Sequence, residues 1–253
     1  MHPTEVLFLG KQPPVSLLVC DQYAGTEKIM RKSVVFQQKL GLVFDITFDC
    51  EDGAAAGNEA VHAQLVASII ASGLINHHFG RIERASPPVH VLIETHGALA
   101  DVVAIATLPQ VESLSFSILD FVLAHYGAIP SDAMRSPGQF THSLVTRAKA
   151  AISAACHAHS KTASHNVNTE IQDIGVIDDD ACCATMEFGY TRMWSIHPLQ
   201  IRHILNAFSP TQSEVSEATH ILLAAQQAAW EPIQHHGNLH DRTSYHYCWA
   251  VLK

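Results

Sequence analysis

The sequence predicts an α/β protein in which helices cover a parallel sheet. Short β-type runs alternate with longer helical patterns, and repeated strand–helix units of this kind build parallel sheets. The strand runs are mostly uninterrupted apolar stretches, which is typical of strands buried on both faces. An open nucleotide-binding sheet is the competing topology, but no GxGxxG motif follows the first strand. The length of 253 residues fits one large domain of α/β-barrel size.

Six strands can be recognised, and each is followed by a helical pattern. We expect the strands at residues 16–20, 43–49, 89–94, 113–120, 161–165 and 192–196. The expected helices cover residues 25–40, 58–72, 98–106, 140–159 and 178–189, and a further one begins at 197–198. Residues 209–229 form an amphipathic helix, and the tail from Trp230 is expected to be irregular. These patterns divide the chain into a barrel domain, residues 1–208, and a C-terminal extension, residues 209–253.

Composition and charge exclude several classes of protein. Acidic residues outnumber basic ones by 24 to 15, whereas nucleic-acid binding needs a clustered basic surface. The longest apolar runs fall far short of the roughly 20 residues of a membrane-spanning helix. The N-terminus lacks the features of a secretory signal, and the six cysteines show no CxxC spacing. We therefore expect a cytoplasmic protein with free thiols that binds neither nucleic acid nor membranes.

The chain contains 18 histidines, which raises the question of a metal site. No HExxH motif is present, and no spacing matches a known ligand template. The adjacent histidines at 77–78 and 235–236 are expected to point their side chains apart. We interpret the histidines as surface and loop residues.

Acidic residues end three of the predicted strands. Asp49 and Asp52 bound one acidic segment, and Glu94 and Asp120 end two later strands. Parallel strands end on one face of such a fold, which is where active sites form. Carboxylates that converge there repel one another unless a cation neutralises them, and hard oxygen ligands suit Mg²⁺. The alternative is that each carboxylate only caps the following helix.

Four motifs, in order, carry a resemblance to a known family. They are DCED at 49–52, IET at 93–95, LD at 119–120 and IHPLQ at 196–200, and a helix start at 208–215 accompanies them. Together with the 26-residue step from Glu94 to Asp120, these motifs resemble the HpcH/HpaI aldolase and citrate lyase beta-subunit family. The resemblance covers residues 17 to about 229. Each motif alone is weak, but their order and spacing are specific.

The resemblance implies a TIM-type (β/α)₈ barrel that uses Mg²⁺ to cleave or form a carbon–carbon bond next to a coenzyme A thioester. Glu94 and Asp120 match the family's metal ligands. Glu51 matches an acidic residue that helps to hold and polarise the substrate. Asp241 is a candidate catalytic residue, because relatives bring a C-terminal segment over a neighbouring subunit's site; its alternative is an ordinary surface pair with Arg242. The residues that bind coenzyme A are not identified.

The sequence departs from this family between Asp52 and Glu94. Glu94 lies only 42 positions after Asp52, whereas the family has two further βα units there, one of which carries a substrate-binding arginine. Arg81 is the only nearby candidate for that arginine. We therefore expect a barrel shortened to about six strands, with exposed edges that favour a homo-oligomer.

Three functions remain open. The first is a lyase that acts on a citryl-, malyl- or citramalyl-CoA type thioester and releases a 2-oxo acid. The second is a metal-dependent aldolase that acts on a 2-oxo acid without coenzyme A. The third is a truncated, inactive family member that serves as a subunit.

Overall fold

The structure is a computed structural model that describes residues 3–9, 16–50, 53–74 and 88–253. These residues divide into two compact units. The larger comprises residues 16–208, and the smaller joins helix α1 (Pro3–Phe8) to residues 209–253. The first helix therefore belongs to the C-terminal unit, although the sequence analysis assigned residues 1–208 to the barrel. No helix in the described part of the chain is long and apolar enough to cross a membrane.

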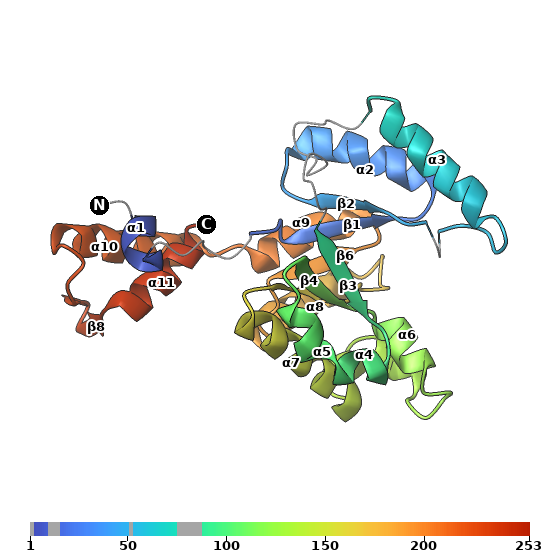
Figure 1. The fold of residues 1–253 in the computed structure, drawn as a ribbon. Helices are drawn as coiled ribbons and strands as arrows, with labels where there is room; N and C mark the ends of the chain where they lie inside the picture. The colour runs from blue at the N-terminus through green and yellow to red at the C-terminus, as the bar shows by residue number, and fades with distance from the viewer. Residues whose placement is uncertain (1–2, 10–15, 51–52, 75–87) are drawn as a thin grey trace. The chain divides into compact units, whose positions relative to one another are not determined.

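The larger unit is built on a six-stranded parallel sheet (Figure 1). Its strands are β1 (Cys20–Ala24), β2 (Asp45–Phe48), β3 (Val89–Ile93), β4 (Val111–Phe116), β5 (Thr162–His165) and β6 (Arg192–Ser195). Their order in the sheet is β2-β1-β6-β5-β4-β3. Cys20 of the first strand pairs with Met193 of the last, which is the strand order of a barrel. Within the described residues no strand joins β2 to β3, and six parallel strands with flanking helices are the predicted shortened barrel.

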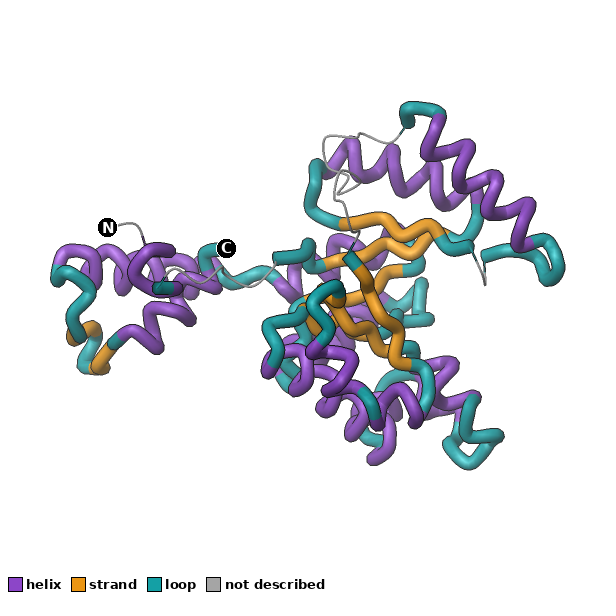
Figure 2. Tube along the Cα trace, in the orientation of Figure 1, coloured by secondary structure: helices purple, strands orange, loops and turns teal. Residues whose placement is uncertain are grey.

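Helices flank this curled sheet (Figure 2). They are α2 (Glu27–Leu40), α3 (Glu59–Ala71), α4 (His96–Ala100), α5 (Val102–Thr107), α6 (Ile118–Leu123), α7 (Ser143–Ala158), α8 (Ile174–Met186) and α9 (Pro198–Phe208), with the 3₁₀ turns η3 (Ser131–Met134) and η4 (Gly138–Phe140). The largest hydrophobic cluster packs β3, β4 and β5 against α4 to α7, with Leu114 and Ile152 fully buried.

Three element boundaries differ from the sequence prediction. Strand β1 lies four residues later than expected, and it includes Asp21, whose carboxylate is buried in an ion pair with Arg192. Strand β4 ends at Phe116, four residues earlier than expected, and the next helix begins at Ile118. Helix α8 starts after Asp173, whose side chain caps it, so the acidic run at 178–180 lies in mid-helix.

A buried charge cluster joins three strands at the amino end of the sheet. Arg192 pairs with Asp21 at 2.9 Å and with Asp45 at 2.6 Å, and its side chain also donates to the Leu18 carbonyl. Burial lowers the pKa of Arg192, but the two carboxylates outweigh this effect and raise it. At this end of a barrel such a cluster serves stability rather than catalysis.

The smaller unit packs α1 against α10 (Gln212–Gln227) and α11 (Arg242–Val251), with a hairpin of β7 (Ile233–His235) and β8 (Asn238–His240). Leu7, Ile221 and Tyr245 are buried in its core. The prediction that the tail from Trp230 is irregular is therefore wrong. Positive φ angles of 48° and 82° at His236 and Gly237 form the tight turn that joins the two strands.

Candidate active site

Glu94 and Asp120 lie at the carboxyl ends of two neighbouring strands. Ile93 pairs with Phe116 at the last position of β3 and β4, and the amide of Ser117 donates to the Ile93 carbonyl at 3.1 Å. Half-buried Glu94 follows β3 directly, and Asp120 lies in the first turn of α6 after β4. The structure therefore places both predicted metal ligands at one edge of the sheet. Their role as ligands stays a prediction.

Residues with hydroxyl side chains occupy the N-cap positions of the two helices that follow β3 and β4. Thr95 is the N-cap of α4, and its side chain accepts from the Ala98 amide at 3.1 Å. The cap of this helix is therefore not Glu94. At α6 the N-cap residue is Ser117, whose hydroxyl donates to the Asp120 carboxylate at 2.5 Å. Asp120 also benefits from the positive end of the helix dipole, so this residue has a structural role at the same time.

Two histidines that the sequence analysis did not single out follow these carboxylates closely in the chain and contact each other. His96 follows Glu94 by two residues, and its Nε2 lies 2.5 Å from Nε2 of His125. His125 uses Nδ1 to donate to the Phe121 carbonyl at 2.6 Å, so His96 is the donor within the pair. Burial lowers the pKa of His96, with smaller contributions from His125 and Arg147. The short spacing from Glu94 was the only sequence signal for this pair.

At the other edge of the sheet, β2 leads into the acidic segment at 49–52. Asp49 is buried, and its amide donates to the Ala24 carbonyl. A Cβ atom on Gly53 would lie only 2.3 Å from the Gly25 carbonyl oxygen, so the two backbones touch. Asp49 and Gly53 thus contact the end of β1 and the residue that follows it. Glu51, the predicted catalytic residue, and Asp52 lie outside the described residues, as does Arg81, the predicted substrate-binding arginine.

Gln200, the last residue of the IHPLQ motif, joins the loops after β5 and β6. Its carboxamide oxygen accepts from the amides of Ile196 and His197, at 2.9 and 3.2 Å. Its nitrogen donates to the carbonyls of Asn168 and Glu170, at 2.7 and 2.8 Å. This buried carboxamide, with four backbone partners, therefore holds the two loops together.

A buried polar network lies beneath the same loops. Lys149 of α7 contacts Gln139, His165 and Asn166, and Gln139 and Asn168 both donate to the Asp180 carboxylate. Burial lowers the pKa of Lys149 well below its usual range, against the opposing charge of Asp180. Burial raises the pKa of Asp180 to about 6. The sequence analysis missed this network because its members are far apart in the chain.

Asp241, the remaining candidate catalytic residue, belongs to the smaller unit. It is the N-cap of α11, and its carboxylate accepts from the amides of Thr243 and Ser244 at 2.9 and 3.4 Å. The backbone amide of Asp241 in turn donates to the Ser244 hydroxyl at 2.9 Å. The structure thus gives this residue a capping function, and its catalytic role stays a prediction.

Comparison with known proteins gave no match to a protein-family model and none to a curated protein. The structure search found a citrate lyase from Burkholderia xenovorans LB400 that is 48% identical, with a TM-score of 0.84 over 100% of this chain and 94% of that one. It also found CitE from Mycobacterium tuberculosis in complex with magnesium, acetoacetate and coenzyme A, at 17% identity and a TM-score of 0.65, over 95% and 97% of the two chains. A citrate lyase beta subunit from the same organism, complexed with oxaloacetate and magnesium, matches at 16% identity and a TM-score of 0.57, over 76% and 97%. The last two show a shared fold, and the first shows that the chain belongs to the citrate lyase family.

Proposed function

We propose that this protein is a Mg²⁺-dependent carbon–carbon lyase that cleaves or forms a hydroxyacyl-CoA thioester of the citryl-, malyl- or citramalyl-CoA type. The products of cleavage are acetyl-CoA and a 2-oxo acid. The observation that carries the proposal is the 48% identity to a citrate lyase over the whole chain. Because that match covers 94% of the relative, little of the relative lacks a counterpart here. This argues against a truncated, inactive product.

The residues at the β3–β4 edge fit a magnesium ion. Glu94 and Asp120 offer carboxylate oxygens, the ligands that Mg²⁺ prefers, from the residue after β3 and from the first turn of the helix after β4, two strands held in register. Thr95 and Ser117 occupy the N-cap positions of α4 and α6, so neither carboxylate is the N-cap of its helix. Bound there, Mg²⁺ would withdraw charge from the substrate oxygen that becomes a carbonyl. Two structures of the same fold hold magnesium with acetoacetate and coenzyme A or with oxaloacetate, which agrees with this proposal.

The other candidate residues have distinct proposed roles. Glu51 would help to hold and polarise the substrate, and Arg81 would bind its carboxylate. The positive charge of Arg81 suits an acidic substrate, and the negative charge of Glu51 suits the cation bound with it. Asp241 would act on the site of a neighbouring subunit. Asp241→Asn tests that role cleanly, because asparagine caps a helix as well as aspartate does but transfers no proton.

The experiment is a side-by-side assay of hydroxyacyl-CoA thioesters and the corresponding free hydroxy acids, with Mg²⁺ present. We expect turnover of a thioester that Glu94→Ala and Asp120→Ala each abolish. Turnover of the free acid alone would instead indicate the coenzyme A-independent aldolase. No turnover of either class by protein that unfolds cooperatively would favour the non-catalytic subunit.

We also propose a cytoplasmic homo-oligomer. The six cysteines are free thiols, which agrees with a reducing compartment. Strand β3 ends the sheet within the described residues and exposes Val89 and Leu92, an edge that a neighbouring subunit can cover. Light scattering after size-exclusion chromatography tests this: a monomer at micromolar concentration would contradict it.

A further inference from the structure

The smaller unit brings together three side chains that have metal-binding groups. Glu217 comes from α10, and His235 and His236 come from the end of β7 and the turn that follows. Nε2 of His235 lies 3.3 Å from Oε1 of Glu217, and Nε2 of His236 lies 4.0 Å from Oε2. One ligand atom from each of the three residues lies within 4.8 Å of the other two.

The tight turn explains why two adjacent histidines face the same way. The sequence analysis expected the side chains of residues 235 and 236 to diverge, as they do along a strand. This expectation is wrong, because His236 adopts a left-handed φ of 48° and the chain reverses there. The ring centroids of His235 and His236 are consequently only 4.1 Å apart. A non-glycine residue in this conformation is itself uncommon.

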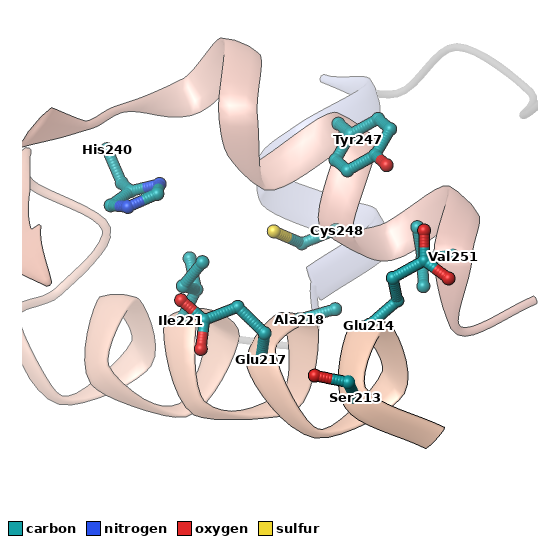
Figure 3. A pocket seen from close by; sticks show the side chains of 9 residues that line it. All are labelled: Ser213, Glu214, Glu217, Ala218, Ile221, His240, Tyr247, Cys248 and Val251. Atoms are coloured by element: carbon teal, nitrogen blue, oxygen red, sulfur yellow. The ribbon is translucent and has the colours of Figure 1, made fainter. Parts of the chain in front are cut away.

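Two nitrogen atoms at this place are buried without a hydrogen bond. Nε2 of His235 is near Glu217, but the geometry is not that of a hydrogen bond, and Nδ1 of His240 has no hydrogen-bond partner among the described residues. The ring of His240 lies 6.2 Å from that of His235. Figure 3 shows His240 and Glu217 lining one pocket of about 330 Å³ between α10 and α11. Buried nitrogen atoms without partners are rare in folded proteins, and a bound ion is one arrangement that satisfies them.

We propose that Glu217, His235 and His236 bind a transition-metal ion of the Zn²⁺ class, with His240 as a fourth ligand. Imidazole nitrogen together with one carboxylate is a ligand set that suits zinc, whereas Mg²⁺ prefers oxygen alone. Tetrahedral bonds of about 2.1 Å place ligand atoms about 3.4 Å apart. The observed separations approach this value, so side-chain rotation brings the ligands onto one ion. The site is separate from the carboxylates of the barrel unit.

The metal would fasten the hairpin to α10. Strands β7 and β8 have only three residues each, and a hairpin of this size is marginally stable in water. An ion held by the hairpin and the helix together binds the folded unit in preference to the unfolded chain, so it stabilises the fold. The proposal therefore assigns the ion a structural role that does not depend on the lyase activity.

The test is a Zn²⁺ titration by calorimetry on the full chain, stripped of metal with a chelator and kept in excess Mg²⁺. Glu94→Gln and Asp120→Asn in the background prevent zinc from binding to the strand-end carboxylates. We expect one Zn²⁺ per chain, and binding at least about tenfold weaker in His235→Gln, His236→Asn and Glu217→Gln. Asparagine is chosen at 236 because it tolerates the left-handed conformation.

Matched controls lie in the same unit but outside the cluster. His246→Asn on α11 and Glu231→Gln should bind Zn²⁺ as the parent does. Far-UV circular dichroism identifies folded variants, and any one folded cluster variant suffices for the comparison. In the same proteins, Co²⁺ should give the intense visible absorption of a tetrahedral nitrogen–oxygen site only when the cluster is intact. Unchanged zinc affinity in the folded cluster variants, or no zinc binding by the folded parent, would overturn the proposal.

Discussion

Nζ of Lys149 lies 2.5 Å from Nε2 of His165, and the other ring nitrogen lies 3.1 Å from the Asn166 carbonyl. A carbonyl oxygen can only accept, so Nδ1 carries the hydrogen and donates to it. Nε2 of the neutral ring is then the acceptor in the contact with Lys149. Burial, and then the lysine charge, lower the pKa of His165 well below its usual range. The neutral histidine and the lysine hold the end of β5 beneath the candidate active site.

Replacing Lys149 by methionine should destabilise the barrel unit. The substitution keeps the length of the side chain but leaves the acceptors of His165 and Asn166 without their donor, and each unsatisfied buried group costs about 1–3 kcal/mol. We expect the free energy of unfolding in urea to fall by about 3 kcal/mol. The control Lys161→Met removes one partly exposed lysine and should cost less than about 1 kcal/mol. Equal effects of the two substitutions would contradict the role given to the network.

Asp180 should make stability fall as the pH rises from about 4 to 6. Its pKa is raised by burial from 3.8 to about 6, so the folded protein keeps a proton that the unfolded chain loses. The stability from this group is present below the unfolded pKa and is lost as the pH rises through the folded pKa. Asp180→Asn still accepts from Gln139 and Asn168 but does not titrate.

Unfolding free energies of both proteins from pH 4 to 7 check this expectation. The variant should gain about 1–3 kcal/mol relative to the parent over that range. The slope of the difference is the measurement, because removal of the carboxylate next to Lys149 also shifts the variant by a constant amount. Parallel pH curves for the two proteins would contradict the raised pKa.

The contact between Gly25 and Gly53 should be sensitive to one methyl group. Gly53→Ala puts a Cβ atom 2.3 Å from a carbonyl oxygen of the backbone, which cannot move as a side chain can. We expect a loss of about 1–3 kcal/mol in stability, and a further loss of lyase activity as the acidic segment shifts. Gly97→Ala is the control, because its Cβ meets nothing closer than 3.8 Å. If Gly53→Ala changed neither stability nor activity, the close contact between the Gly25 and Gly53 backbones would not be needed.

Replacing Gln200 tests whether the IHPLQ motif stabilises the loops after β5 and β6. Gln200→Leu removes four hydrogen bonds to the backbone and leaves those groups buried, so we expect a loss of about 2–4 kcal/mol. Gln38→Leu, on the exposed side of α2, is the control and should be close to neutral. Full stability of Gln200→Leu, measured by urea unfolding, would mean that water replaces the side chain.

The sequence predicted the six strands because each is a short apolar run between helical patterns. It misplaced β1 because the charge on Asp21 is neutralised by Arg192, 171 positions along the chain, which no local pattern shows. It placed Glu94 and Asp120 at strand ends on local grounds. The contacts of Lys149 and Gln200 depend on tertiary packing, so the sequence could not show them. The hairpin was missed because histidine precedes the turn glycine where asparagine is more usual.

Magnesium titration by calorimetry, with and without oxaloacetate or glyoxylate, tests the central claim most directly. The account predicts that Mg²⁺ binds, that the oxo acid tightens its binding, and that Glu94→Gln and Asp120→Asn each abolish the heat. Asp179→Asn, which removes an exposed carboxylate from α8, should leave the titration unchanged. No heat from the parent protein with either oxo acid, or the same heat from all three variants, would contradict a magnesium site at the β3–β4 edge.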